Sequence, residues 1–288
     1  MTATATVTTT NPFAIPRNFL ANRFVYVTVS PRAKGLSVGV NLNPDKHCNF
    51  DCAYCEVNRL SPATDQRLDI DVMVTELQNT LDLIRSGSLQ GLPEFRSLPD
   101  NLLQLKHVAL SGDGEPTLCT IFLEAVEAVL HLRALNRSNF FKLVLITNAS
   151  NLDAEQVQQG VQLMTKADEV WAKLDVGTPE QLRKINRTDV PLDKIFANIL
   201  LMARKRPVVI QSLFASIDGE EPTAAEIDAY VDRLEQLKNS GAQIQLVQIY
   251  SATRPVGQLH HCEHLSLRRL SQIAQTVRSK TGLKVEIF

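Results

Sequence analysis

Short apolar runs alternate with longer amphipathic segments along most of this chain, and this alternation restricts the fold more than any other feature. The strand-like runs are rich in β-branched and other apolar residues, and they occupy 36–42, 107–110, 143–146, 169–174, 208–214 and 244–249. Each is followed by a segment with helical spacing of its apolar residues, at 71–85, 121–135, 154–164, 192–203, 224–238 and 267–279. The alternation predicts βα units that share a parallel sheet.

Six consecutive βα units predict an α/β fold, specifically a partial (β/α)6 TIM-like barrel. Right-handed crossovers curl successive parallel strands in one sense, which favours a barrel-like sheet. An open doubly wound sheet is the alternative, because both architectures bury their strands on two faces. In either case the functional site is expected at the C-terminal ends of the strands.

The domain prediction is one core domain preceded by a short tail. Residues 1–23 are expected to be disordered or extended, and residues 24–288 to form the core, with strands at 24–29 and 284–288 and a polar insertion at 86–103. A length of 288 residues, of which 44% are hydrophobic, suits one sizeable core.

The charge balance and the cysteine usage restrict the environment of the chain. Its 30 basic and 31 acidic residues nearly cancel, so overall charge favours neither a nucleic-acid coat nor a membrane-surface protein. The N-terminal region shows no secretory pattern and no apolar run is long enough to cross a bilayer. Three of five cysteines crowd into eight residues, unlike a disulfide framework, so a cytoplasmic location is expected.

Cys48, Cys52 and Cys55 stand at C-x3-C-x2-C spacing, close enough for one loop to bind three irons of a 4Fe–4S cluster. Electron-transfer clusters use four protein thiolates, whereas three leave one iron open to a small molecule. An open iron can chelate the amino and carboxylate groups of S-adenosylmethionine (SAM). The alternative is a non-enzymatic zinc-binding interaction module that also uses His47, although zinc ligands usually come as two separated pairs.

The triplet, with Tyr54 just before its last cysteine, resembles the signature of the radical SAM superfamily. Residues 40–46 and 56–59 are similar to a subgroup related to tRNA wyosine-base (imidazoguanosine) synthases, and the likeness extends from about Gly35 to the C-terminus. The resemblance implies an oxidoreductase or transferase that cleaves SAM reductively to a 5′-deoxyadenosyl radical, with flavodoxin or ferredoxin as electron donor. It also implies a tRNA guanosine as substrate and pyruvate as carbon donor.

Two alternatives to this substrate stay open, namely a small molecule and the glycine of a partner protein that a radical SAM activase would act on. The wyosine synthases carry further cysteines upstream for a second cluster. No cysteine precedes Cys48 in this sequence, so a single cluster is expected.

The loop after the second predicted strand of the βα series is the main candidate for cofactor binding. Gly112 and Gly114 allow close approach of the backbone to a ligand, and Glu115 offers a carboxylate to an ammonium group. The segment resembles the GGE motif of the superfamily, which binds the methionine amine. Tyr54 is expected to stack near the adenine or to shield the cluster.

Later strand ends carry polar residues that a buried strand does not need. Asn148, Lys173 and Asp175 are candidates for contacts to ribose hydroxyls and to the methionine carboxylate. A helix cap at Asn148 and a structural ion pair between Lys173 and Asp175 are the alternatives.

The substrate side is less specified by the sequence. Arg187, Tyr250 and Arg254 are candidates for substrate contacts, and Cys119 for donation of a hydrogen atom. The cluster at 260–264 is expected to contact substrate rather than to bind a metal. Local phosphate contacts are predicted for five basic residues near the N-terminus, namely Arg17, Arg23, Arg32, Lys34 and Lys46.

Overall fold

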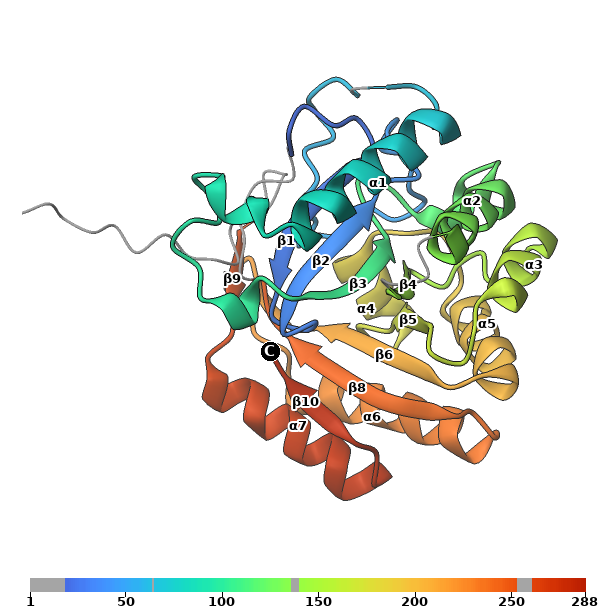
Figure 1. Ribbon diagram of the computed structural model, residues 1–288. Helices are drawn as coiled ribbons and strands as arrows, with labels where there is room; N and C mark the ends of the chain where they lie inside the picture. Colours follow the sequence, from blue (N-terminus) through green and yellow to red (C-terminus); the bar gives the residue numbers. More distant parts are fainter. Residues whose placement is uncertain (1–18, 64, 136–139, 253–260) are drawn as a thin grey trace, which may run out of the picture.

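The computed structural model describes residues 19–63, 65–135, 140–252 and 261–288. A curled eight-stranded sheet forms its centre (Figure 1). The strands, in spatial order, are β1 (Val25–Ser30), β2 (Gly35–Val40), β3 (Leu105–Leu110), β4 (Lys142–Thr147), β5 (Glu169–Lys173), β6 (Val208–Leu213), β8 (Ile244–Tyr250) and β10 (Val285–Ile287). The connecting helices are α1 (Ile70–Arg85), α2 (Phe122–Leu135), α3 (Glu155–Leu163), α5 (Leu192–Lys205), α6 (Ala224–Asn239) and α7 (Leu267–Thr281).

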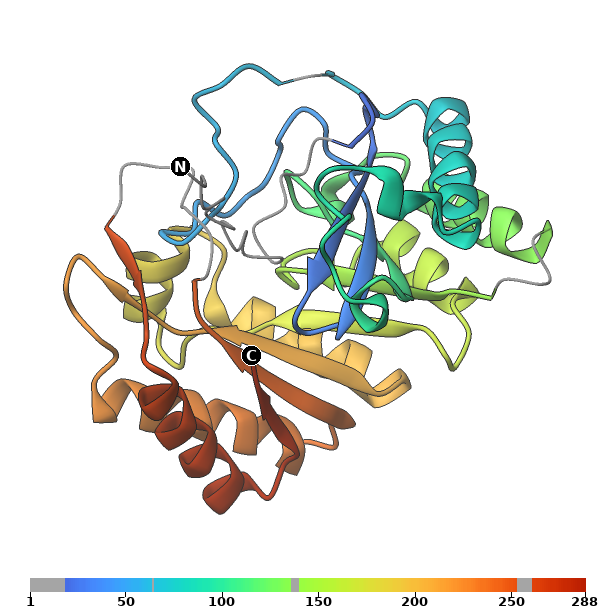
Figure 2. The same cartoon turned by 60° about the vertical axis from the view of Figure 1, so that its left-hand side comes forward.

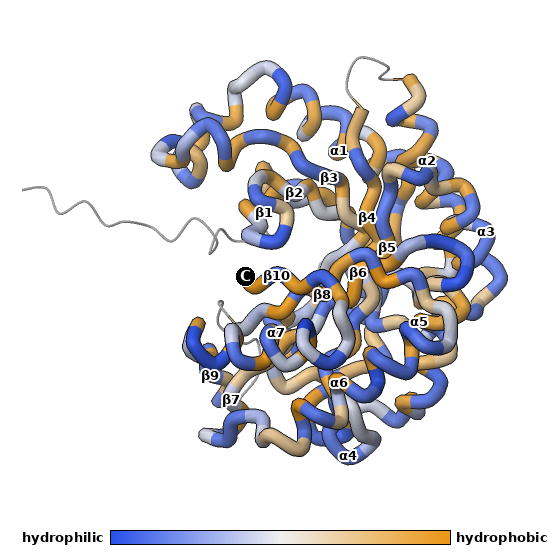
Figure 3. The backbone as a smooth tube through the Cα atoms, turned by 90° about the horizontal axis from the view of Figure 1, so that it is seen from below, coloured by the Kyte–Doolittle hydropathy of each residue, from blue (hydrophilic) through white to orange (hydrophobic). Residues whose placement is uncertain are grey.

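The predicted partial (β/α)6 barrel is confirmed. Strands β2 to β6 and β8 pair in parallel, each followed by a helix, while β1 adds an antiparallel edge and β10 a parallel one. Viewed along the curled sheet, the helices lie around its outside (Figure 3). A doubly wound sheet would carry helices on both faces, so this alternative is excluded.

Alternation along the strands separates an inner from an outer apolar layer. Inward-facing side chains from four neighbouring strands form a cluster inside the curl, namely Ala109, Val144, Trp171 and Val209. The residues that precede them face the helices and belong to the main core, namely Val108, Leu143, Val170 and Val208. Because both faces are buried, the strands are continuously apolar in sequence, which is why periodicity alone could not distinguish the two architectures.

The edges of the sheet, β1 and β10, leave the barrel open along one side. The turn that joins β1 to β2 lies beside the C-terminus across this opening (Figure 2). Lys34 Nζ in this turn donates to Glu286 Oε2 of β10 at 3.0 Å. The turn therefore approaches the far edge of the sheet, although the two edges do not pair as strands.

Three features of the packing were not expected from the sequence. Phe19 is buried and packs edge-on against Phe95 at 6.2 Å, so the packed part begins before residue 24. The supposed insertion at 86–103 contributes Leu89 and Phe95 to the core. The segment after Leu213 forms a further strand, β7 (Ala215–Ile217), which pairs with β9 (Cys262–His264) in a small antiparallel sheet. Within the described residues, no helix is long and apolar enough to cross a membrane.

Candidate functional site

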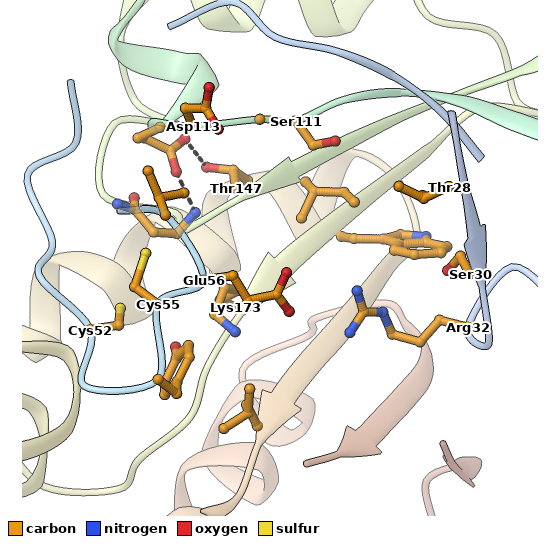
Figure 4. A pocket seen from close by; sticks show the side chains of 18 of the residues that line it. Thr28, Ser30, Arg32, Cys52, Cys55, Glu56, Ser111, Asp113, Thr147 and Lys173 are labelled. Carbon is orange, nitrogen blue, oxygen red and sulfur yellow. Dashed lines mark hydrogen bonds between the residues drawn. The ribbon is translucent and has the colours of Figure 1, made fainter. Parts of the chain in front are cut away.

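A cavity of about 290 Å³ opens at the C-terminal ends of the strands, where the sequence predicted the site. Cys48, Cys52 and Cys55 line it together with the segment 111–116. In Figure 4, Cys52 and Cys55 lie on one side of the cavity and Arg32 on the other. The fold therefore directs the three thiols into one space, as a shared metal centre requires.

The cysteine loop presents free, half-buried thiols. Among the described residues, no group of three or more His, Cys, Asp or Glu side chains is gathered closely enough to hold a metal ion. Burial, followed by the negative charge of Asp175, raises the pKa of Cys52 to about 12. Burial likewise raises the pKa of Cys48. The thiols of Cys48 and Cys52 are therefore protonated at neutral pH, and metal binding has to release these two protons.

Three N–H groups approach the sulfur atoms. The backbone N–H of Phe50 donates to Cys48 Sγ at 3.4 Å, and Asn186 Nδ2 donates to Cys52 Sγ at 3.4 Å. Asn148 Nδ2 lies further off, at 3.9 Å from Cys48 Sγ. Such donors favour thiolate and tune a bound cluster. A set of three thiols with N–H donors around the sulfurs fits an iron–sulfur cluster in its chemistry.

The two glycines of the second loop are required by contact with the cysteine loop. A Cβ on Gly114 would lie 2.1 Å from the carbonyl oxygen of His47, and one on Gly112 would lie 2.3 Å from Asn41 Oδ1. The backbone N–H of Glu115 also donates to His47 O at 3.0 Å. From the sequence, these glycines were expected to let the backbone come close to a ligand. Both line the cavity, but the close contacts that the structure shows are with protein atoms.

Glu115 is a buried carboxylate whose two oxygens have unequal numbers of donors. Oε1 accepts from Thr117 N–H, the Thr117 hydroxyl and, at 2.6 Å, the Thr147 hydroxyl. Oε2 accepts from the backbone N–H of Asn148 at 2.7 Å. Burial raises the pKa of Glu115, although the hydrogen bonds act against that rise. Because a carboxylate oxygen has about two acceptor sites, Oε2 is the atom with capacity for a ligand ammonium.

Asn148 joins the end of β4 to the cysteine loop. Its Nδ2 donates to Asn49 Oδ1 at 2.9 Å, and its Oδ1 accepts from the backbone N–H of Ser150 at 2.9 Å. The helix cap considered as an alternative is not formed, because α3 begins at Glu155 with Ala154 as its N-cap, and Asn148 instead closes a local turn with Ser150. Asn148 also lines the cavity, so its predicted contact to a ribose stays a prediction.

Lys173 and Asp175 form the ion pair that was considered as the structural alternative. Lys173 Nζ lies 3.2 Å from Asp175 Oδ1 and donates to the Tyr250 hydroxyl at 2.9 Å. The Tyr54 hydroxyl donates to Asp175, which fixes the aromatic ring beside the cysteines. Burial lowers the pKa of Lys173, but the charge of Asp175 and the contact with Tyr250 outweigh it, and the pKa is raised. Lys173 is therefore charged where it lines the cavity.

Asn186 is a site residue that the sequence reasoning missed. It ends the π-helical turn η5 (Leu182–Asn186), and its Nδ2 lies 2.9 Å from Asp175 Oδ2 and 3.1 Å from the Tyr54 hydroxyl. The neighbouring Arg187, chosen from the same motif, does not line the cavity. The signal lay in the motif 185–188, whose backbone also accepts from Asp51 N–H and Ala53 N–H.

Two residues considered in the sequence analysis lie away from the cavity. Cys119 belongs to the main core and does not line the cavity, so donation of a hydrogen atom by its thiol stays a prediction. His47, the proposed fourth zinc ligand, has an exposed side chain that is not part of the cavity wall. Arg254 and His260 lie outside the described residues, and the rest of the 260–264 cluster is largely strand β9.

His107 and Trp171 form part of the cavity wall inside the barrel. Their rings meet edge-on at 5.2 Å, and His107 Nε2 lies 2.8 Å from Ser37 Oγ. Burial, followed by the charges of Lys142 and Arg32, lowers the pKa of His107 to about 3. The imidazole is therefore neutral at neutral pH and acts as a hydrogen-bonding wall group.

The lowered pKa of His107 predicts a loss of stability in mild acid. The unfolded chain takes up a proton below about pH 6.5 whereas the folded form does not, so the free energy of unfolding falls as pH drops from 6.5 towards 3. The expected loss from this group at pH 5 is about 2 kcal/mol. Urea unfolding at pH 7 and pH 5 should show that loss in the wild type and not in His107→Gln. The control His131→Gln, at an exposed site, should lose as much free energy of unfolding between the two pH values as the wild type does. An equal loss in all three proteins would contradict the assignment.

The curled half-barrel is the fold of radical SAM enzymes of known structure. A radical SAM methyltransferase from Sphaerobacter thermophilus matches 92% of this chain and 68% of its own, with a TM-score of 0.62 and 15% identity. A TYW1 structure with a lysine–pyruvate adduct bound matches 91% of this chain and 85% of its own, with a TM-score of 0.59 and 15% identity. Streptococcus suis SuiB bound to S-adenosylmethionine matches 89% of this chain and 52% of its own, with a TM-score of 0.58 and 14% identity.

Sequence comparison leads to UPF0026 proteins. The one from Synechocystis is 29% identical over 179 residues, which cover 61% of this chain and 57% of that protein. The one from Methanocaldococcus jannaschii is 29% identical over 174 residues, which cover 60% and 47%. The chain thus spans about half the length of the curated relatives it matches. No protein-family model matches it.

Proposed function

We propose that this chain is a radical SAM enzyme with one 4Fe–4S cluster at Cys48, Cys52 and Cys55. The observation that carries the proposal is the placement of all three thiols in one cavity, together with Glu115, at the C-terminal ends of a half-barrel. When bound, the cluster and SAM would supply an electron and the 5′-deoxyadenosyl radical that abstracts hydrogen from a substrate.

The residues of the chain have separable tasks in this proposal. The three thiolates hold the cluster, while Phe50 N–H and Asn186 Nδ2 donate to two of the sulfurs. Glu115 Oε2 accepts a hydrogen bond from the ammonium group of SAM. The assignments of Asn148, Lys173 and Asp175 to the ribose and carboxylate of SAM are part of the same proposal.

The proposal is tested by incubating the anaerobically reconstituted chain with SAM and a strong reductant. We expect methionine and 5′-deoxyadenosine in equal amounts, and neither product when the reductant is left out. A protein that carries the cluster and binds SAM, yet releases no 5′-deoxyadenosine, would contradict the proposed activity. Flavodoxin and ferredoxin are the proposed physiological donors, and each can replace the chemical reductant in the same assay.

The proposed substrate is a guanosine in tRNA. Support comes from the stretches 40–46 and 56–59, which are similar to wyosine synthases. The basic residues near the N-terminus add little support for tRNA binding, because Arg23 pairs with Asp65 and Lys46 Nζ donates to acceptors of Asn58 and Ser61. Incubation with unmodified tRNA should change the mass of one guanosine nucleoside. Unchanged tRNA alongside active SAM cleavage would favour a small molecule or a glycyl-radical partner.

A further inference from the structure

Arg32 differs from the other basic residues near the N-terminus because it lines the cavity. It lies in the turn between β1 and β2, which crosses the open side of the barrel towards the C-terminus (Figure 2). Lys34, two residues further on, pairs instead with Glu286 at 3.0 Å. The turn thus uses one cation to contact β10 and directs the other into the cavity (Figure 4).

The guanidinium of Arg32 is held in place by an aromatic ring. Its central carbon lies 4.2 Å from the ring centroid of Tyr250, and the hydroxyl of that tyrosine accepts from Lys173 Nζ. Stacking fixes the plane of a guanidinium while leaving the N–H groups at its edge available. The side chain is therefore oriented before any ligand binds.

One N–H group of Arg32 is buried without an acceptor. Its Nε has no hydrogen-bond partner among the residues that the structure describes. A buried donor without a partner is unfavourable, so an acceptor supplied by a ligand would stabilise the bound form.

The other charges around the cavity are largely balanced by protein groups. Lys173 pairs with Asp175, and Arg59 Nη1 donates to the carbonyl of Phe50 at 2.6 Å. Glu56 also lines the cavity and lies between Lys173 and Arg32 in Figure 4. For Arg32, by contrast, the described residues show no carboxylate within ion-pair distance.

We propose that Arg32 binds an acidic group of the substrate, a carboxylate or a phosphate, on the side of the cavity opposite the cysteines. The planar fork of arginine matches both groups through paired N–H donors. That the bound molecule is a substrate rests on the proposed function, but the anion site itself depends only on Arg32 and Tyr250. It restricts the substrate to molecules that place an acidic group across the cavity from the reacting end.

The test is an equilibrium titration of the full chain with inorganic phosphate and, separately, with acetate, at constant ionic strength. Trp171, the single tryptophan of the chain, lines the cavity and reports binding by its fluorescence. We expect saturable binding of at least one anion, and the tighter of the two identifies the acidic group. Arg32→Gln should weaken this binding about 10-fold or more, and Arg32→Lys should weaken it less.

Lys34→Gln is the matched control, because it removes a cation from the same turn that does not line the cavity, and it should bind the anion as the wild type does. Equal binding by Arg32→Gln and wild type, or no saturable binding by the wild type, would overturn the proposal. A titration repeated with saturating SAM should give the same anion affinity. Competition would show that Arg32 serves the carboxylate of SAM and would also overturn it. None of these readouts needs SAM cleavage. A protein that binds the anion but does not cleave SAM would therefore refute the proposed function and leave the anion site standing.

Discussion

Cys48→Ala, Cys52→Ala and Cys55→Ala are each expected to abolish SAM cleavage, leaving no 5′-deoxyadenosine above the reductant-free background. All three thiols line the same cavity, and a cluster with one open iron needs every one of them. Each variant should also lose most of its iron on reconstitution. The measurement is product formation by chromatography, alongside iron content per folded chain.

Cys262→Ala is the control for the cysteine series. Cys262 lies in β9, does not line the cavity, and is a free cysteine like the others. This variant should keep both its iron and its cleavage activity. Cleavage that survives in any of the three alanine variants at Cys48, Cys52 or Cys55 would contradict the ligand assignment.

Glu115→Gln is expected to weaken SAM binding about 10- to 100-fold while the iron content stays at the wild-type level. A hydrogen bond to a charged partner contributes roughly 1.5 to 3 kcal/mol, and glutamine removes the charge that would face the ammonium group. Glutamine gives a more specific test than alanine, because Thr117 and Thr147 both donate to Glu115 Oε1 and alanine would leave them without an acceptor. Equilibrium binding of SAM to the reconstituted protein measures the effect.

The control for this variant is Glu124→Gln, which changes an exposed glutamate in the first turn of α2. It should bind SAM as tightly as the wild type. If Glu115→Gln loses its iron, the residue acts by supporting the cysteine loop, through the contact of its N–H with His47 O, rather than by binding SAM.

The barrel and the cysteine site could be predicted because both depend on local patterns. Six strand-then-helix alternations predict six βα units, and their curl follows from the handedness of the crossovers. The C-x3-C-x2-C spacing lies within one loop, so its meaning does not depend on the rest of the chain. Local patterns could not predict the burial of Phe19, because it depends on contact with Phe95, which is distant in sequence.

The remaining parts of the site depend on contacts between distant segments. Asn186 lies 134 positions from Cys52, to which it donates, so the motif 185–188 could mark its region but not the residue that it contacts. Gly112 and Gly114 line the cavity, but a sequence cannot show that protein atoms rather than a ligand approach them closely. Arg32 was recognised only as a cation, because its direction into the cavity follows from how the β1–β2 turn crosses the open side of the barrel.

Metal analysis after anaerobic reconstitution tests the central claim most directly. Iron, sulfide and zinc are quantified per folded chain, and the visible absorption spectrum is recorded on the same sample. We expect about four irons and four sulfides per chain, with broad visible absorption, as a 4Fe–4S cluster gives. Stoichiometric zinc, with no iron and no broad absorption, would contradict it and would instead make this chain a zinc-binding module.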